Sequence, residues 1–310
     1  MSTKTTTATT APAKPTPPGR LAPPYPVALL DRLLLAALDE DVGGGDITTQ
    51  LTVPPGTAVK GRIVAKDDLV LAGAFVAQRV FFLVEPAVEL RWLAADGALV
   101  RKGDVVAEIS GPAQGVLTGE RLALNFLQRL SGIATGTRAM VDAAAGNKAR
   151  IVDTRKTTPG LRALEKWAVR VGGGANHRAG LHDGILIKDN HLAAAGGITP
   201  AVNAARAGAP HTMRVEVEVE SLAQLEEAIT AGAEVVLIDN FGEGAWPAVV
   251  KAARGRVLIE ISGNMDVRRA ALAAQAGADF ISAGVLTHSV RAADLSLRLD
   301  VVKGRGPRRK

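Results

Sequence analysis

The sequence predicts an α/β protein with two parts, a small antiparallel sheet followed by a run of β/α units. The chain has 310 residues, 47% of them hydrophobic and 22% charged, which is enough for one large or two medium domains. Residues 58–117 contain β-rich runs separated by Gly and Asp turns, a pattern typical of an antiparallel sheet. From residue 150 onward, short β-branched runs alternate with helical stretches, which predicts parallel strands covered by helices.

The first 25 residues are rich in Thr, Ala and Pro and cannot bury apolar surface, so we predict a disordered arm. No apolar run reaches the length of a membrane span, and the arm lacks the apolar core of a signal peptide. The chain has no Cys, which excludes disulfides, thiol nucleophiles and Cys-ligated metal sites. We therefore expect a cytoplasmic protein that does not bind membranes.

The net charge of +6 comes from the two ends of the chain. Residues 1–25 hold three basic residues and the basic tail, 303–310, holds five, with no acid in either segment. The remaining 29 basic and 31 acidic residues nearly cancel, and only ten residues are aromatic. The body of the protein therefore offers neither the basic surface nor the stacking side chains of a specific nucleic-acid-binding protein.

The first half should begin with a helix over residues 27–38, followed by a turn-rich segment over residues 40–49. Residues 119–146 also have helical spacing, and a break is expected near Ser131–Gly132, where the small domain would hand over to the next. The strands expected between these helices are 59–66, 69–73, 88–94 and 104–110.

The second half should contain six parallel strands. Their predicted ranges are 149–154, 183–188, 213–219, 233–239, 256–262 and 278–283. A weak internal repeat supports two of them, because residues 231–238 and 276–283 both read as a helix-ending glycine followed by a strand. The run predicts a β/α barrel or an open doubly wound sheet, and the missing early G-x-G-x-x-G motif favours the barrel.

Each of these predicted strands ends in residues that can take part in chemistry, through a polar side chain or a backbone N–H. In a β/α barrel all strand C-termini face one mouth, where active sites are built. A single polar residue there could be a helix cap, but six strands ending in this way indicate an active site. The groups are Asp153 to Lys156, Lys188 to Asn190, Glu218, Asp239 with Asn240, Ser262 to Asn264, and Ala283 with Gly284.

Glutamate alternates with valine over residues 215–220, so the carboxylates point to one side of the strand. Carboxylates inside a barrel are costly unless a cation or metal pairs with them. Glu218 and Asp239 supply two hard oxygen ligands, which suit Mg²⁺ held jointly with a phosphorylated substrate. Ion pairing of these carboxylates to Lys156 or Lys188 is an alternative, and the two can coexist.

Residues 150–190 contain eight Lys and Arg against four acids, which predicts an anion-binding region. Arg162, Lys166 and Arg170 are four residues apart, so we assign them to a solvated helix face outside the site. Glycines within 262–264 and 283–285 precede helical segments, where backbone N–H groups can bind phosphate. The cations expected in the site are Arg155, Lys156, His177, Arg178 and Lys188.

Residues 154–191, with the blocks TRKTTPG and GGGANHR, closely resemble the signature of the quinolinate phosphoribosyltransferases, the nicotinate-nucleotide pyrophosphorylases (carboxylating) of NAD biosynthesis. The blocks EDVGGGDITT, ERLALNFLQRLSGIAT, VEVEVES, LIDNF, EISGN and SAGVLTHS occur in the order shown by that family. The resemblance covers residues from about 26 to 300.

The resemblance implies an N-terminal α/β sandwich domain and an incomplete α/β (TIM-like) barrel of about six parallel strands. The sandwich would span residues 26–122 and be completed by residues 285–302, with the barrel over residues 123–284. It also implies a homodimer, or a higher oligomer, with shared active sites. The disordered arm, 1–25, and the basic tail, 303–310, would lie outside both domains.

The implied activity is that of a pentosyltransferase that uses Mg²⁺. It would transfer phosphoribosyl from phosphoribosyl pyrophosphate to quinolinate and release pyrophosphate and CO₂, giving nicotinate mononucleotide. By matching positions, Arg155, His177 and Arg178 would hold the two quinolinate carboxylates, together with Arg121 from the other subunit. Thr154 lies beside Arg155 and belongs to the same substrate-binding set.

The same matching implies roles at the phosphoribosyl end. Lys156 and Lys188 would contact the donor, while Glu218 and Asp239 would face the ribose and the metal, with Lys156, Glu218 and Asp239 as the catalytic residues. Asn264 stands where many relatives have Gly. The residues that would bind phosphate are Ser262, Gly263, Asn264, Ala283, Gly284 and Val285.

Two alternatives remain at this point. The first is a molybdenum-locus paralogue of the same fold that acts on another base, but the cluster of Arg155, His177 and Arg178 favours a dicarboxylate. The second is a non-catalytic sugar-phosphate binding protein, which we would expect to have lost Lys156 or the acidic pair.

Overall fold

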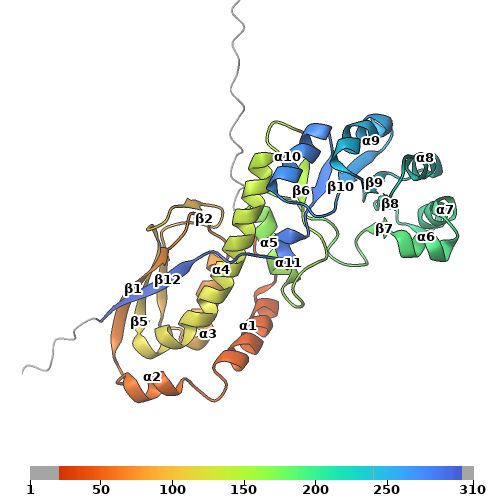
Figure 1. The fold of residues 1–310 in the computed structure, drawn as a ribbon. Helices are drawn as coiled ribbons and strands as arrows, with labels where there is room; N and C mark the ends of the chain where they lie inside the picture. Colours follow the sequence, from red (N-terminus) through yellow and green to blue (C-terminus); the bar gives the residue numbers. More distant parts are fainter. Residues whose placement is uncertain (1–20, 240, 302–310) are drawn as a thin grey trace, which may run out of the picture.

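The computed structural model describes residues 21–239 and 241–301 (Figure 1). Most of the predicted arm and the whole of the basic tail lie outside the described residues. Within the described part of the chain, no helix is both long enough and apolar enough to cross a membrane.

The N-terminal part is built on a four-stranded antiparallel sheet with the order β12-β1-β5-β3. Side chains along β1 alternate between exposed and buried, as expected for a sheet covered on one face. The strands are β1 (Ala58–Ala65), β3 (Glu89–Trp92), β5 (Val105–Pro112) and β12 (Leu295–Val301), and a separate pair is formed by β2 (Leu69–Val70) and β4 (Leu99–Val100).

Helices α3 (Ala74–Val84) and α4 (Ala113–Ala143) pack on each other and on this sheet (Figure 1). The predicted strands of this region are present, while α3 interrupts the β-rich segment. Helix α1 (Val27–Asp41) buries leucines spaced by four residues. Helix α2 (Ile47–Thr52) is capped by Asp46, whose carboxylate accepts a hydrogen bond from the Thr49 N–H.

The predicted helix break near Ser131–Gly132 is wrong, because α4 runs through both residues without interruption. The buried Ser131 hydroxyl accepts a hydrogen bond from the Ala72 N–H at 3.0 Å. At Gly132, a Cβ would lie 2.3 Å from the Arg291 carbonyl oxygen, so only glycine allows this close approach. The small residues therefore serve packing and leave the helix intact.

The C-terminal part contains all six predicted strands, in a parallel sheet with the order β6-β11-β10-β9-β8-β7. From β7 to β11, strands consecutive in the chain are neighbours, and β11, the last strand, lies beside β6, the first. This is the order of a barrel that stays open between β6 and β7, and a doubly wound sheet would reverse its order instead. The strands are β6 (Arg150–Val152), β7 (Ile185–Ile187), β8 (Val215–Val219), β9 (Val235–Ile238), β10 (Leu258–Ile261) and β11 (Phe280–Ser282).

Helices follow these strands and cover the outside of the sheet (Figure 1). They are α5 (Arg162–Val171), α6 (Asp189–Ala195), α7 (Ile198–Gly208), α8 (Leu222–Ala231), the 3-10 turn η1 (Glu243–Ala245) with α9 (Trp246–Ala253), α10 (Val267–Ala276) and α11 (Val285–His288). After α11 the chain returns to the N-terminal sheet, where β12 pairs antiparallel with β1 from Val59↔Val301 to Ala65↔Leu295. The last strand of the described chain therefore completes the N-terminal sheet.

Candidate active site

A cavity of about 490 Å³ lies at the carboxyl ends of the barrel strands. Most of the residues predicted for the site line it, and these are Thr154, Arg155, Lys156, His177, Arg178, Lys188, Glu218, Asp239, Ser262, Gly263, Asn264, Gly284 and Val285. Ala283 is buried at the end of β11 and does not line the cavity. Arg121 is exposed on α4, away from the lining residues.

The sequence analysis missed six further lining residues, which are Leu186, Leu237, Glu260, Met265, Ser282 and His288. Strand register would have found part of this set. Glu218 pairs with Leu237, and Leu237 pairs with Glu260, so these three side chains face the same side of the sheet.

Two guanidinium groups, those of Arg155 and Arg178, line the cavity, and we call the part that they line its guanidinium end. Burial and the neighbouring charge of Arg155 lower the pKa of Arg178, so the two cations repel each other across the cavity. The Nε atom of Arg155 is buried and has no hydrogen-bond partner among the described residues. A ligand with two carboxylates would relieve the repulsion and supply the missing acceptor.

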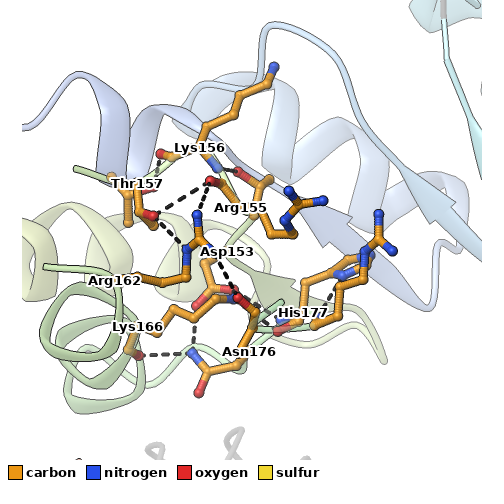
Figure 2. Close-up of polar contacts among 12 residues, drawn as sticks. Asp153, Arg155, Lys156, Thr157, Arg162, Lys166, Asn176 and His177 are labelled. Carbon is orange, nitrogen blue, oxygen red and sulfur yellow. Dashed lines mark hydrogen bonds and ion pairs between the residues drawn. The ribbon is translucent and has the colours of Figure 1, made fainter. Parts of the chain in front are cut away.

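A buried network beneath these cations holds the loops that carry them (Figure 2). The Asp153 carboxylate pairs with the Lys166 ammonium and accepts hydrogen bonds from the Asn176 side chain and, at 3.0 Å, from the His177 N–H. The Lys166 ammonium also donates to the His177 carbonyl oxygen at 2.9 Å. Ala175 pairs with Val152 at the open edge of β6 in an isolated parallel β-bridge. These backbone hydrogen bonds also hold the loop that carries His177 and Arg178.

The prediction that Lys166 lies on a solvated helix face is wrong, because the residue is only 5% exposed. Residue spacing identified a common face of α5 but not its surroundings, and that helix is buried on most of its sides. Arg162 also points inward, with its Nε donating to the Thr157 hydroxyl at 2.9 Å (Figure 2). Of the three cations assigned to that face, Arg170 is exposed.

Both ring nitrogens of His177 have partners within the protein. Nδ1 lies 2.7 Å from the Arg178 N–H, and because an amide N–H can only donate, Nδ1 accepts this bond. The proton therefore sits on Nε2, which donates to Glu216 at 3.1 Å. Burial acts to lower the pKa of His177, but the hydrogen bond to Glu216 and the negative charge on the pair of carboxyl groups formed by Glu216 and Glu260 outweigh it and raise the pKa. A carboxylate ligand on this ring would have to replace one of the two partners.

Carboxylates and lysines are also among the lining residues, and we call the part that they line the lysine end or the other end of the cavity. Glu218 forms an ion pair with Lys188, which was the alternative to metal binding in the sequence analysis. Asp239 follows the neighbouring strand, β9, and also lines the cavity. The carboxylate oxygens of Glu218 and Asp239 are hard ligands of the kind that Mg²⁺ prefers.

Glycines and one asparagine bring the backbone close to this end. Gly263 has a φ of 95°, and a Cβ there would lie 3.1 Å from the Asp239 carboxylate. Asn264 has a φ of 45°, in the left-handed region that glycine adopts freely and asparagine tolerates better than most residues. Asparagine therefore fits this position better than most other residues with a Cβ would.

The chain matches the family model described as quinolinate phosphoribosyl transferase, N-terminal domain, over residues 46–131 and the corresponding C-terminal domain over residues 133–298. It is 48% identical over 271 residues to the nicotinate-nucleotide pyrophosphorylase (carboxylating) of Mycobacterium leprae, covering 85% of this chain and 94% of the relative. A probable enzyme of the same name from Bacillus subtilis is 44% identical over 86% of this chain and 92% of its own length.

Solved structures agree with these sequence matches. The nicotinate-nucleotide pyrophosphorylase of Francisella tularensis superimposes with a TM-score of 0.84 at 39% identity, covering 89% of this chain and 98% of the other. The matched segments include the cavity and the returning strand up to residue 298. The chain therefore belongs to the quinolinate phosphoribosyltransferase family.

Proposed function

We propose that this protein transfers phosphoribosyl from phosphoribosyl pyrophosphate to quinolinate and decarboxylates the product. The products are nicotinate mononucleotide, pyrophosphate and CO₂, as in NAD biosynthesis. The observation that carries the proposal is that one cavity is lined both by two mutually repelling guanidiniums and by the Lys188–Glu218 ion pair with a second lysine and a second carboxylate.

The guanidinium end suits a planar dicarboxylate. Arg155 and Arg178 can each donate two hydrogen bonds to a carboxylate, and a guanidinium cannot lose its charge at neutral pH. Binding of both carboxylates of quinolinate would fix the position of its ring nitrogen relative to the phosphoribosyl donor. The reaction then becomes effectively unimolecular, with the two reacting atoms already oriented.

The lysine end suits the displacement of pyrophosphate. Positive charge develops at the ribose C1 and negative charge on the leaving group, so Glu218 and the two lysines stabilise the transition state more than the ground state. Lys156 and Lys188 line the same end of the cavity as the Ser262–Asn264 backbone, and together they would hold the phosphates.

Glu218 and Asp239 are the residues that would hold Mg²⁺, with hard oxygens from adjacent strand ends. When bound, Mg²⁺ supplies charge neutralisation at the pyrophosphate. Decarboxylation needs little more from the protein, because alkylation of the ring nitrogen lets the adjacent carbon carry the electron pair left by CO₂. That carbon then takes up one proton to give the product.

The direct test is to incubate the purified protein with quinolinate, phosphoribosyl pyrophosphate and Mg²⁺. We expect nicotinate mononucleotide and CO₂ in equal amounts. The Lys156→Ala variant should form neither at a comparable rate, because it lacks a cation at the phosphate end. Wild-type protein that binds both substrates and releases no product would refute the proposal.

The active form is a homodimer in which Arg121 of one subunit completes the site of the other. Arg121 is exposed on α4 outside the cavity. Nearby α1 and α2 expose Leu35 (51%), Ile47 (69%) and Leu51 (81%), and a neighbouring subunit would cover such an apolar surface.

Mixing inactive Arg121→Ala and Lys156→Ala chains should restore part of the activity, because some mixed dimers would contain one wholly intact site. Activity is measured after subunit exchange has been verified by mass spectrometry of differently labelled chains. Exchange without recovery would show that each site uses residues of one chain alone.

A further inference from the structure

Two carboxyl groups meet beneath the guanidinium end of the cavity. Glu216 lies on β8 and Glu260 on β10, and they are 7% and 3% exposed. The His177 Nε2 atom is 3.1 Å from one oxygen of Glu216 and 3.7 Å from one oxygen of Glu260. Neither glutamate has a role in the phosphoribosyl chemistry proposed above.

The remaining oxygen of each group is unsatisfied. Oε1 of Glu216 and Oε1 of Glu260 are both buried without a hydrogen-bond partner among the described residues. Ionised carboxylates only accept hydrogen bonds, so two ionised side chains would repel each other and leave these atoms unpaired. One proton on the pair removes the repulsion and supplies a donor.

The surroundings decide which group holds that proton. Burial, and then the negative charge of Glu216, raise the pKa of Glu260 to about 8, with His177 opposing the shift. Beside Glu260, Leu237 on β9 and Phe280 on β11 are uncharged, and the strand residue Ser282 contributes a hydroxyl.

Glu216, in contrast, faces one hydrogen-bond donor and a neighbouring positive charge. It accepts the hydrogen bond from His177, and its charge acts on the guanidinium of Arg178 to favour the charged form. The His177 Nε2 atom is nearer to Glu216, at 3.1 Å, than to Glu260, at 3.7 Å, so a proton on Glu260 leaves Glu216 as the acceptor for this ring.

We infer that Glu260 is a positioning residue for quinolinate binding and that it acts in its neutral, protonated form. It leaves Glu216 as the single negative charge beneath the guanidinium end, so that Glu216 holds the His177 ring and faces Arg178. A second negative charge in this position would compete for Arg178 and repel a dianionic ligand. The inference rests on the proposed function, since it names the ligand of this end of the cavity.

A divalent cation could in principle replace the proton. One ligand atom from each of His177, Glu216 and Glu260 lies within 4.8 Å of the others. The positive charges of Arg155 and Arg178 at the same end oppose a cation and favour a proton, which brings one unit of charge instead of two.

The test is a calorimetric titration of quinolinate alone into wild-type protein and the Glu260→Gln variant at pH 7 and pH 9. Glutamine keeps the size and the neutral donor but cannot ionise. We expect the wild-type affinity to fall roughly tenfold between the two pH values, and the variant to match wild type at pH 7 and to change little at pH 9. The exposed Glu89→Gln serves as a matched control that should behave as wild type.

The inference is overturned if the wild-type affinity is constant from pH 7 to pH 9, or if Glu260→Gln loses affinity at pH 7 while remaining folded. A wild-type protein that binds no quinolinate at either pH refutes the proposed function instead.

Infrared spectroscopy tests the proton without any ligand. Wild type at pH 7 should show the carbonyl band of a protonated carboxyl that weakens at pH 9 and is absent from the variant. A missing band refutes the inference, as does tight binding of Zn²⁺ to wild type that Glu260→Gln abolishes.

Discussion

Replacing Lys166 by Met should lower the free energy of unfolding by about 3–5 kcal/mol, because it leaves the buried Asp153 carboxylate without its cation. Asp153 is fully buried at the end of β6, and Met fills a similar volume without restoring the charge. Protonation of Asp153 can recover part of the loss, since burial already acts to raise the pKa of this carboxyl. Chemical denaturation at pH 7 measures the effect.

Two control variants separate burial from ion pairing as such. Lys148→Met breaks the pair with Asp279, but the Lys148 side chain is 61% exposed, so the cost should stay below about 1 kcal/mol. The double variant Asp153→Asn, Lys166→Met leaves no unpaired charge and should recover most of the stability. Equal losses in Lys166→Met and Lys148→Met would contradict the importance of the buried pair.

The same double variant tests what the network does for the site. Asp153 and Lys166 contact the backbone N–H and carbonyl oxygen of His177 on either side of its side chain. Losing the charge-assisted bonds should loosen the loop that carries Arg178. We expect weaker quinolinate binding and unchanged binding of phosphoribosyl pyrophosphate in a protein that remains folded.

Replacing Arg178 by Ala should weaken quinolinate binding by roughly ten- to hundredfold, which corresponds to the ~1.5–3 kcal/mol of a hydrogen bond to a charged group. Binding of phosphoribosyl pyrophosphate should change little, because Glu218, Lys188 and Asp239 line the other end of the cavity. Calorimetric titration of each substrate separately measures both effects.

The matched control is Arg170→Ala, which removes an exposed arginine at the end of α5 and should leave both affinities unchanged. If Arg178→Ala instead loses the phosphoribosyl donor and binds quinolinate normally, the assignment of the two ends of the cavity is reversed.

Glu218→Gln should have the complementary effect. It keeps the size of the side chain and removes its charge, so turnover should fall while quinolinate affinity is largely kept. The positive charge that Glu218 opposes appears only in the transition state. The substitution also removes the ion-pair partner of Lys188. Calorimetric titration of phosphoribosyl pyrophosphate into wild type and into the variant measures how this loss changes binding of the donor.

All six barrel strands were predictable because each is a short run rich in β-branched and aliphatic residues between turn signals. The position of the polar groups was predictable for a related reason. Parallel strands joined by right-handed crossovers place all their carboxyl ends at one edge, so residues such as Glu218 and Asp239 had to meet there.

Features that depend on which side of an element is covered were not predictable. The spacing of Arg162, Lys166 and Arg170 places them on one face of a helix in any environment, and only packing shows that Lys166 is buried. The Ser131–Gly132 pair reads as a helix break from its composition, yet its small side chains accommodate a loop that lies far away in the sequence.

The sequence by itself determined the order of the barrel strands and most of the cavity lining, because local periodicity and strand-end position carry that information. Its motif blocks carried the resemblance that identified the family. Only the tertiary structure decided how charges pair inside the protein. Glu216 and Glu260 lie on separate strands, and His177 comes from a loop, so no local pattern connects them. Their protonation follows from burial and from distances through space, which arise only when the strands have assembled into the sheet.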